Sequence, residues 1–203
     1  MISTYIFNKL REQVTKHSHV LELGEQILFE EKDRTAGPRI RDIRPETATW
    51  TTIDLGSKSP DVVQADIGGY SEEWLLRFNL IIDGGTMEHV EPKTSQYQGF
   101  RNVSEYCAVG GEIWLLLPSP GTWPGHCRYR YPLAFFLWRG FVTDFQIIGE
   151  GEERLTFARL KRLQLSPFMS PTTFWSRVEV TDERPNKATN DPKGIWYGND
   201  KAE

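Results

Sequence analysis

The chain has 203 residues, of which 38% are hydrophobic and 26% charged, and its formal net charge is −4 at pH 7. This length and composition are typical of one globular domain, and the acidic balance argues against a nucleic-acid-binding protein. The two cysteines, Cys107 and Cys127, are not spaced as metal ligands, so we expect neither a disulfide framework nor a metal site.

Near the N-terminus, Ile6, Leu10 and Val14 are apolar residues spaced four apart. This spacing predicts an amphipathic helix over residues 4–16. A short apolar run at residues 20–23 predicts the first strand, and the charged stretch 26–49 predicts a loop with at most one short helix. The first residues lack the apolar segment of a signal peptide, and no apolar run approaches ~18 residues. We therefore expect a cytoplasmic protein without a membrane span.

The central part of the chain contains three short apolar runs that end at or beside an aspartate. They predict strands at residues 51–55, 62–65 and 78–82. Ser71 followed by two glutamates predicts a short capped helix between the last two of these strands. Apolar residues three or four apart then predict a helix over residues 93–107, ended by Gly110-Gly111.

The C-terminal half is predicted to hold a strand at residues 112–117 and a short helix at 132–139. Two further runs, 141–148 and 155–163, flank a turn of glycine and glutamate and predict a β-hairpin. Strands that alternate with helices predict an α/β fold with a mostly parallel sheet, to which the hairpin adds an antiparallel edge.

We expect residues 1–165 to form this domain. Residues 166–203 accumulate proline, asparagine, aspartate and lysine, and we expect them to be a polar C-terminal extension that is partly disordered.

Carboxylates or glycines follow nearly every predicted strand, and ligands of open α/β sheets bind outside the carboxyl ends of the strands. These residues are Glu22, Gly24, Asp54, Asp66, Asp83 and Gly84. A glycine lets the backbone come close to a ligand, and a carboxylate after the second strand can bind ribose hydroxyls. The structural alternative is that each aspartate before a glycine only hydrogen-bonds the backbone of its own turn. This alternative does not account for Glu22, which lies inside an apolar strand, where glutamate is disfavoured.

The order of several segments resembles the class I S-adenosylmethionine-dependent methyltransferases. The segments are VLELG, TTIDLG, DVVQADI, FNLIIDGGTMEHV and GGEIWLLLPSPG, followed by the late hairpin. The resemblance runs from about residue 20 to residue 163 and implies a Rossmann-like three-layer sandwich with a seven-stranded sheet. It further implies an enzyme that uses S-adenosylmethionine to methylate a small-molecule or glycan-type acceptor by in-line transfer.

The resemblance also implies roles for individual residues. Glu22 and Gly24 lie in the first cofactor loop, Asp54 binds the ribose, Asp66 and Ile67 lie at the adenine, and Asp83 and Gly84 lie near the methionine amino group. The stretch TMEHV is similar to the (T/V)xEHV segment of many small-molecule methyltransferases. The family loop is usually Glu/Asp-x-Gly-x-Gly-x-Gly, whereas this chain keeps only the first glycine.

Two histidines, His89 and His126, follow the first predicted strand and fall near the same edge. Because histidine titrates near neutral pH, either is a candidate base for the acceptor's proton. The structural alternatives are a loop hydrogen bond for His126 and a turn cap for His89. Arg128 and Arg130 either hold an anionic substrate or lie on the surface.

Three other functions stay open at this point. The reduced glycine loop favours a non-catalytic binding or scaffold protein with the methyltransferase fold. A nicotinamide oxidoreductase would need the G-x-G-x-x-G that is missing here, and a nucleic-acid methyltransferase would need an Asn/Asp-Pro-Pro-aromatic motif. We expect a small-molecule or glycan partner, no nucleic acid, and a homodimer if the chain self-associates.

Overall fold

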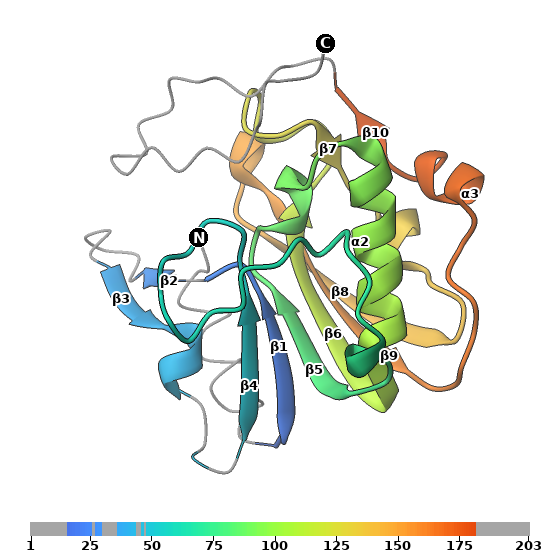
Figure 1. Cartoon of the computed structure of the whole chain (residues 1–203). Helices are drawn as coiled ribbons and strands as arrows, with labels where there is room; N and C mark the ends of the chain where they lie inside the picture. The colour runs from blue at the N-terminus through green and yellow to red at the C-terminus, as the bar shows by residue number, and fades with distance from the viewer. Residues whose placement is uncertain (1–15, 26, 30–35, 44–45, 47, 182–203) are drawn as a thin grey trace.

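The computed structural model describes residues 16–25, 27–29, 36–43, 46 and 48–181, and Figure 1 shows their arrangement. Within these ranges the central element is a mixed sheet of six strands. In spatial order they are β4 (Thr49–Ile53), β1 (His19–Leu23), β5 (Phe78–Asp83), β6 (Cys107–Pro118), β9 (Leu155–Arg162) and β8 (Phe141–Ile148).

The first four strands of this order pair in parallel, whereas β9 pairs antiparallel with both β6 and β8. The predicted α/β class, the mostly parallel sheet and the antiparallel hairpin at one edge are therefore confirmed. The resemblance implied seven strands, and the described residues supply six. The strand predicted at residues 62–65 is only an isolated bridge from Val63 to Ile53, since the apolar run there is two valines long and Val63 is exposed.

One face of the sheet is covered by the helix α2 (Lys93–Tyr106), which lies in front of the sheet in Figure 1 and contacts β6. The helix forms because its apolar residues repeat every three or four positions, and Phe100, Val103 and Tyr106 are fully buried. Each of these side chains stabilises the fold by roughly 2 kcal/mol through burial. The helix predicted over residues 93–107 is confirmed.

The opposite face of the sheet carries a second apolar cluster. Its buried members are Val20, Leu80, Ile82, Trp114, Leu116 and Phe157. Beside it, Glu112 accepts hydrogen bonds from Trp114 Nε1 at 2.9 Å and from Arg159 Nε and Nη2 at 2.7 and 2.6 Å. Both faces of the parallel strands are thus packed, which is why their sequences are nearly continuously apolar.

The chain after residue 165 packs against the α2 side of the domain as far as the structure describes it. It contains α3 (Pro171–Trp175) and β10 (Glu179–Val180), which pairs antiparallel with β7 (Tyr129–Arg130). Phe174 is fully buried, with its ring 5.7 Å from that of Phe100. The boundary expected at residue 165 stays a prediction, and residues 182–203 lie outside the described residues.

Two predicted short helices are single turns of 3-10 helix, η2 (Glu72–Trp74) and η4 (Leu133–Phe136). Ser71 precedes η2 but makes no side-chain capping hydrogen bond. η4 is short although Phe135 and Phe136 are fully buried in the core.

The predicted stop of α2 at Gly110-Gly111 is wrong. The helix ends at Tyr106, and the chain enters β6 directly at Cys107. Gly110 has a φ of +82°, and the register between β5 and β6 shifts beside it. These glycines therefore permit an irregularity in a strand and do not end a helix.

The segment predicted as a loop at residues 26–49 contains a small antiparallel pair, β2 (Ile27–Phe29) and β3 (Ala36–Arg39), followed by the 3-10 turn η1 (Ile40–Ile43). The helix predicted at residues 4–16 falls outside the described residues, apart from residue 16. Among the described helices, none is long and apolar enough to cross a membrane.

Candidate active site

The carboxyl ends of β4, β1 and β5 meet at one edge of the sheet. The register aligns Leu23 of β1 with Ile53 of β4 and with Asp83 of β5. The residues that follow these strands are therefore neighbours, although they are distant in the sequence. This edge is where ligands bind in open α/β folds.

The turn after β1 is built on Gly24, which has a φ of +72° and donates its N–H to the carbonyl of Ile53 at 2.7 Å. The carboxylate of Asp54 lies beside this turn. It accepts the N–H of Glu25 at 2.9 Å, of Gly56 at 2.7 Å and of Ser57 at 3.1 Å. Backbone donors thus hold Asp54 in one position, and they join the ends of β1 and β4.

Glu25 occupies the position after this glycine and is the centre of a polar network. Its carboxylate pairs with Arg39 at 2.7 Å and Arg41 at 2.8 Å, and accepts the hydroxyls of Ser57 at 2.8 Å and Ser59 at 2.9 Å. The network ties the segment after β1 to the segment after β4. Sequence reasoning did not single out Glu25, because its partners come from two segments that are distant in the sequence, residues 39–41 and 57–59.

Glu22 is fully buried inside the sheet. Its carboxylate accepts hydrogen bonds from Thr52 Oγ1 at 2.8 Å and from Trp50 Nε1 at 3.0 Å. A charged side chain in a strand is costly unless it is hydrogen-bonded, and these two donors on β4 supply the compensation. The structure therefore places Glu22 as a link between β1 and β4.

Asp66 and Ile67 lie where the loop before η2 meets α2. The Asp66 side chain is exposed and accepts the N–H of Gly68 at 2.8 Å, which is a local turn bond. Ile67 is buried, and its carbonyl accepts Asn102 Nδ2 at 2.7 Å. The helix thus fixes Ile67, while the carboxylate of Asp66 stays at the surface.

Asp83, the last residue of β5, is buried and accepts backbone N–H groups from Gly85 at 3.1 Å and Thr86 at 2.8 Å. Buried Gly84 follows it. Five residues after Asp83, Glu88 lies in the turn η3 (Met87–His89) and is 4% exposed. Burial raises the pKa of both carboxyls well above the usual range, and the charge of Glu88 raises the pKa of Asp83 further.

His89 and His126 come together at this edge. Their ring centroids are 4.7 Å apart in an edge-to-face arrangement, and His89 Nε2 lies 3.9 Å from Glu88 Oε1. Burial lowers the pKa of each imidazole to about 4. Both rings are therefore neutral at neutral pH, which makes them weak proton acceptors when they act alone.

The loop that carries His126 runs from the end of β6 to β7 and is held by Arg130. Arg130 is 1% exposed and donates to the carbonyls of Thr122, Trp123, Cys127 and Tyr129. The expectation that this residue lies on the surface is wrong, because the loop folds around the guanidinium and satisfies it. Arg128 is partly exposed, 3.7 Å from Glu91.

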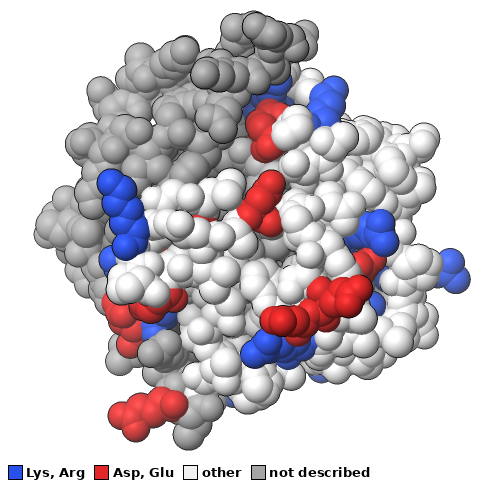
Figure 2. Space-filling view, in the orientation of Figure 1, with Lys and Arg blue, Asp and Glu red and all other residues white. Residues whose placement is uncertain are grey.

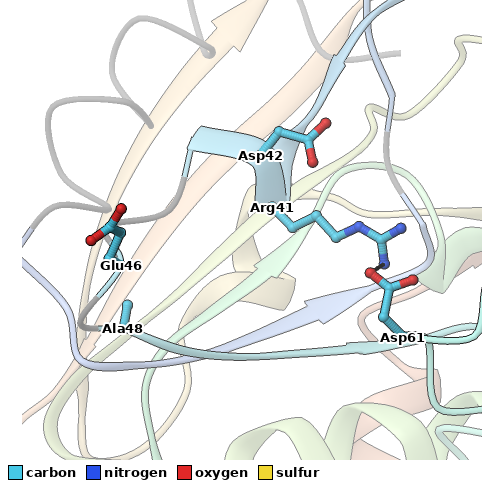
Figure 3. Close-up of a pocket in the computed structure, with 5 residues that line it drawn as sticks. All are labelled: Arg41, Asp42, Glu46, Ala48 and Asp61. Atoms are coloured by element: carbon cyan, nitrogen blue, oxygen red, sulfur yellow. Dashed lines mark ion pairs between the residues drawn. The ribbon is translucent and has the colours of Figure 1, made fainter.

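A hollow of about 550 Å³ is lined by Arg41, Asp42, Glu46, Ala48 and Asp61, and Arg41 also pairs with Glu25. Figure 3 shows the Arg41 guanidinium turned toward Asp61, and the two groups form an ion pair at 2.9 Å. The hollow flanks the edge strand β4 and contains none of the predicted site residues. We therefore place the candidate site at the edge with Asp54, Asp83 and His126.

Glu88 is the functional candidate to which the sequence analysis assigned no role. The signal for Glu88 was its position directly before His89 in the segment TMEHV. Figure 2 shows one face of the molecule, on which acidic and basic side chains are interspersed over a largely uncharged surface. On that face, no extended basic patch is formed by the described residues.

Comparison with known proteins bears on the fold. No protein-family model and no curated protein matches the chain. The chain is similar to the crystal structure of Burkholderia thailandensis 1,6-didemethyltoxoflavin-N1-methyltransferase, with a TM-score of 0.54 and 15% identity over 78% of this chain and 77% of that one. That enzyme was crystallised with 1,6-didemethyltoxoflavin and S-adenosylhomocysteine.

A second similar structure is the N-methyltransferase NodS from Bradyrhizobium japonicum WM9 in complex with S-adenosylhomocysteine, with a TM-score of 0.53 and 15% identity over 79% of this chain and 87% of that one. The chain has the class I methyltransferase fold. This confirms the expected fold, while the roles of individual residues stay predictions. In this class I fold, the edge with Gly24, Asp54 and Asp83 is formed by the carboxyl ends of three adjacent parallel strands.

Proposed function

We propose that the chain is an S-adenosylmethionine-dependent methyltransferase that acts on a small-molecule or glycan-type acceptor by in-line methyl transfer. The observation that carries this proposal is the shared fold with two methyltransferases that hold S-adenosylhomocysteine. The order of acids and glycines along the carboxyl edge supports it.

The residues at this edge fit the cofactor by their chemistry. Asp54 is held by three backbone donors and is a pre-organised acceptor for ribose hydroxyls. The exposed carboxylate of Asp66 suits the adenine amino group, with Ile67 beside the ring. Asp83 and Gly84 would lie near the cationic amino group of the methionine part.

Gly24 and Glu22 would shape the loop that holds the cofactor. The left-handed turn at Gly24 lets the backbone approach a ligand without a Cβ atom. Glu22 positions that turn, because its hydrogen bonds to β4 fix the end of β1. When bound, S-adenosylmethionine supplies a methyl group on a cationic sulfur, and the acidic edge favours its positive charge.

His89 and His126 are the proposed contacts to the acceptor. Both imidazoles are neutral and partly exposed, so each can accept a hydrogen bond from an acceptor O–H or N–H group. The main contribution of the chain to catalysis would be alignment of the acceptor with the methyl group.

A non-catalytic binding protein with the same fold is the second candidate. Glu25 follows Gly24, and its carboxylate ties together the segments that flank the proposed cofactor loop. These contacts would hold the loop in place without a bound cofactor, as expected for a protein that serves only as a binding partner or scaffold.

Calorimetric titration of the full chain with S-adenosylmethionine and S-adenosylhomocysteine separates the two candidates. We expect both ligands to bind, and Asp54→Asn to weaken binding about tenfold, since a hydrogen bond to a charged group contributes about 1.5 kcal/mol. Asp144→Asn, the same change at an exposed position on β8, is the matched control. Absence of binding at millimolar ligand would leave only the scaffold candidate, and equal weakening in both variants would place the ligand elsewhere.

The acceptor is found by following the release of S-adenosylhomocysteine with panels of small molecules and glycans. Turnover with a small molecule or a glycan supports the proposal, whereas turnover only with nucleic acid would overturn the acceptor class. A cytoplasmic location, the absence of a nucleic-acid partner and a homodimer upon self-association remain proposals. Cell fractionation, gel-shift assays and analytical ultracentrifugation test these three proposals in turn.

A further inference from the structure

Glu88, His89 and His126 form a compact cluster of side chains that carry metal-ligating atoms. The ligating atoms of the three residues all lie within 4.8 Å of one another. Glu88 and His89 come from η3 after β5, and His126 comes from the loop after β6, so two neighbouring strands of the sheet bring the cluster together. Within the described ranges, no other group of three His, Cys, Asp or Glu side chains lies this close.

The carboxylate of Glu88 is the second observation that points to a ligand. The residue is 4% exposed, and its Oε2 atom is buried without a hydrogen-bond partner. A buried carboxylate oxygen that lacks a partner is costly, and either a proton or a bound cation removes that cost. The nearby cation, Arg130, directs its guanidinium donors to loop carbonyls and to the Cys127 sulfur.

The chemistry of the three donors selects the kind of ion. Two imidazoles and one carboxylate are typical of Zn²⁺ and Fe²⁺ sites that keep an open coordination position, whereas Mg²⁺ and Ca²⁺ prefer oxygen ligands. An imidazole binds a metal ion through an unprotonated ring nitrogen, and each of the two rings offers one such ligand atom.

The geometry requires only a small adjustment. Tetrahedral bonds of about 2.1 Å place ligand atoms roughly 3.4 Å apart, so the cluster must close by about 1.4 Å at its widest separation. Rotation about side-chain torsions supplies such a movement, and neither His89 nor His126 is fully buried. The partial exposure also leaves the open coordination position accessible from solvent.

We propose that Glu88, His89 and His126 form a binding site for a divalent transition-metal ion of the Zn²⁺ type. The open coordination position would take an oxygen or nitrogen atom of a ligand at the carboxyl edge of the sheet. With an ion bound, the two histidines are ligands and do not act as bases. The site does not depend on the proposed methyl transfer, because metal binding is measured without S-adenosylmethionine and cofactor binding is measured without metal.

Titration of the full chain with Co²⁺ tests the site, since bound Co²⁺ acquires visible absorption bands and Zn²⁺ should displace it. We expect one equivalent to bind, and we expect Glu88→Gln and His126→Asn each to weaken the affinity by at least about tenfold. The matched control is His19→Gln, which changes an exposed histidine at the start of β1 and should leave the affinity unchanged. Circular dichroism confirms that each variant is folded.

A second measurement uses the chain without substitutions, so its result does not depend on whether a variant folds. In nitrogen-15 spectra of the four histidines, Zn²⁺ should shift the ring signals of His89 and His126 and leave those of His17 and His19 in place. The proposal is overturned if Co²⁺ gives no bands at millimolar concentration, if His126→Asn binds as tightly as the parent, or if His19→Gln abolishes binding. The last result would place the ion on the His17-Ser18-His19 segment.

Discussion

A pair of glycine substitutions separates backbone strain from packing in this fold. Gly140 and Gly110 have nearly the same positive φ, +83° and +82°. An added Cβ atom at Gly140 would lie 2.7 Å from Ser166 Oγ and 2.8 Å from the carbonyl oxygen of Gln164, whereas at Gly110 nothing lies within 4 Å. Both positions therefore carry the cost of a side chain at positive φ, and they differ in whether an added Cβ atom would clash.

The expected magnitudes follow from these contacts. Gly110→Ala should lower the free energy of unfolding by about 1–2 kcal/mol, the cost of the left-handed conformation. Gly140→Ala should lose about 1–3 kcal/mol more, because backbone and side-chain atoms must move apart. The Gln164 carbonyl has little freedom to move, since the N–H groups of Leu163 and Gln164 both donate to the Gly140 carbonyl, at 2.8 and 3.3 Å.

Urea denaturation followed by tryptophan fluorescence measures both variants, with the midpoint compared at equal m. Adding Ser166→Gly to Gly140→Ala removes two of the three close contacts, so the double variant should recover part of the loss. Equal destabilisation by the two alanine substitutions would refute the reasoning. It would also show that the chain around residue 166 does not pack tightly against the sheet.

Further predictions concern buried polar groups. Burial raises the pKa of Cys107 and Cys127 to about 12, so neither thiol should react with a disulfide reagent at pH 8 until urea unfolds the chain; labelling of the folded protein would contradict this. Arg130→Lys should cost about 3 kcal/mol in urea denaturation, because at least two buried carbonyls each lose a donor contributing roughly 1.5 kcal/mol, and an unchanged midpoint would refute it. Burial raises the pKa of Asp83 to about 8 and that of Glu88 to about 7, so the folded state keeps protons that the unfolded state has lost. The unfolding free energy of the metal-free protein should therefore fall as the pH rises from about 5 to 8, and the fall should be smaller in Glu88→Gln; an identical slope in that variant would contradict the assignment.

Much of the fold was predictable because its signals are local. The helix α2 follows from apolar residues three and four apart, and the β8–β9 hairpin from two apolar runs around a glycine-rich turn. The sequence was misleading where a strand depends on pairing with a neighbouring strand, because the local pattern of apolar residues does not show whether that neighbour is available. Residues 62–65 are apolar enough to suggest a strand, but only Val63 bridges to β4.

The amino-acid sequence by itself determined the α/β class, the order of the parallel strands along the chain and the acids and glycines that follow them. Only the tertiary structure brought Glu88 and His126 together, because β5 and β6 lie side by side in the sheet. It also decided that Arg130 is buried. A charged side chain is expected to be exposed, but the folded loop supplies carbonyl groups that accept the hydrogen bonds of this guanidinium. Periodicity acts over a few residues, whereas a site depends on which distant segments pack together.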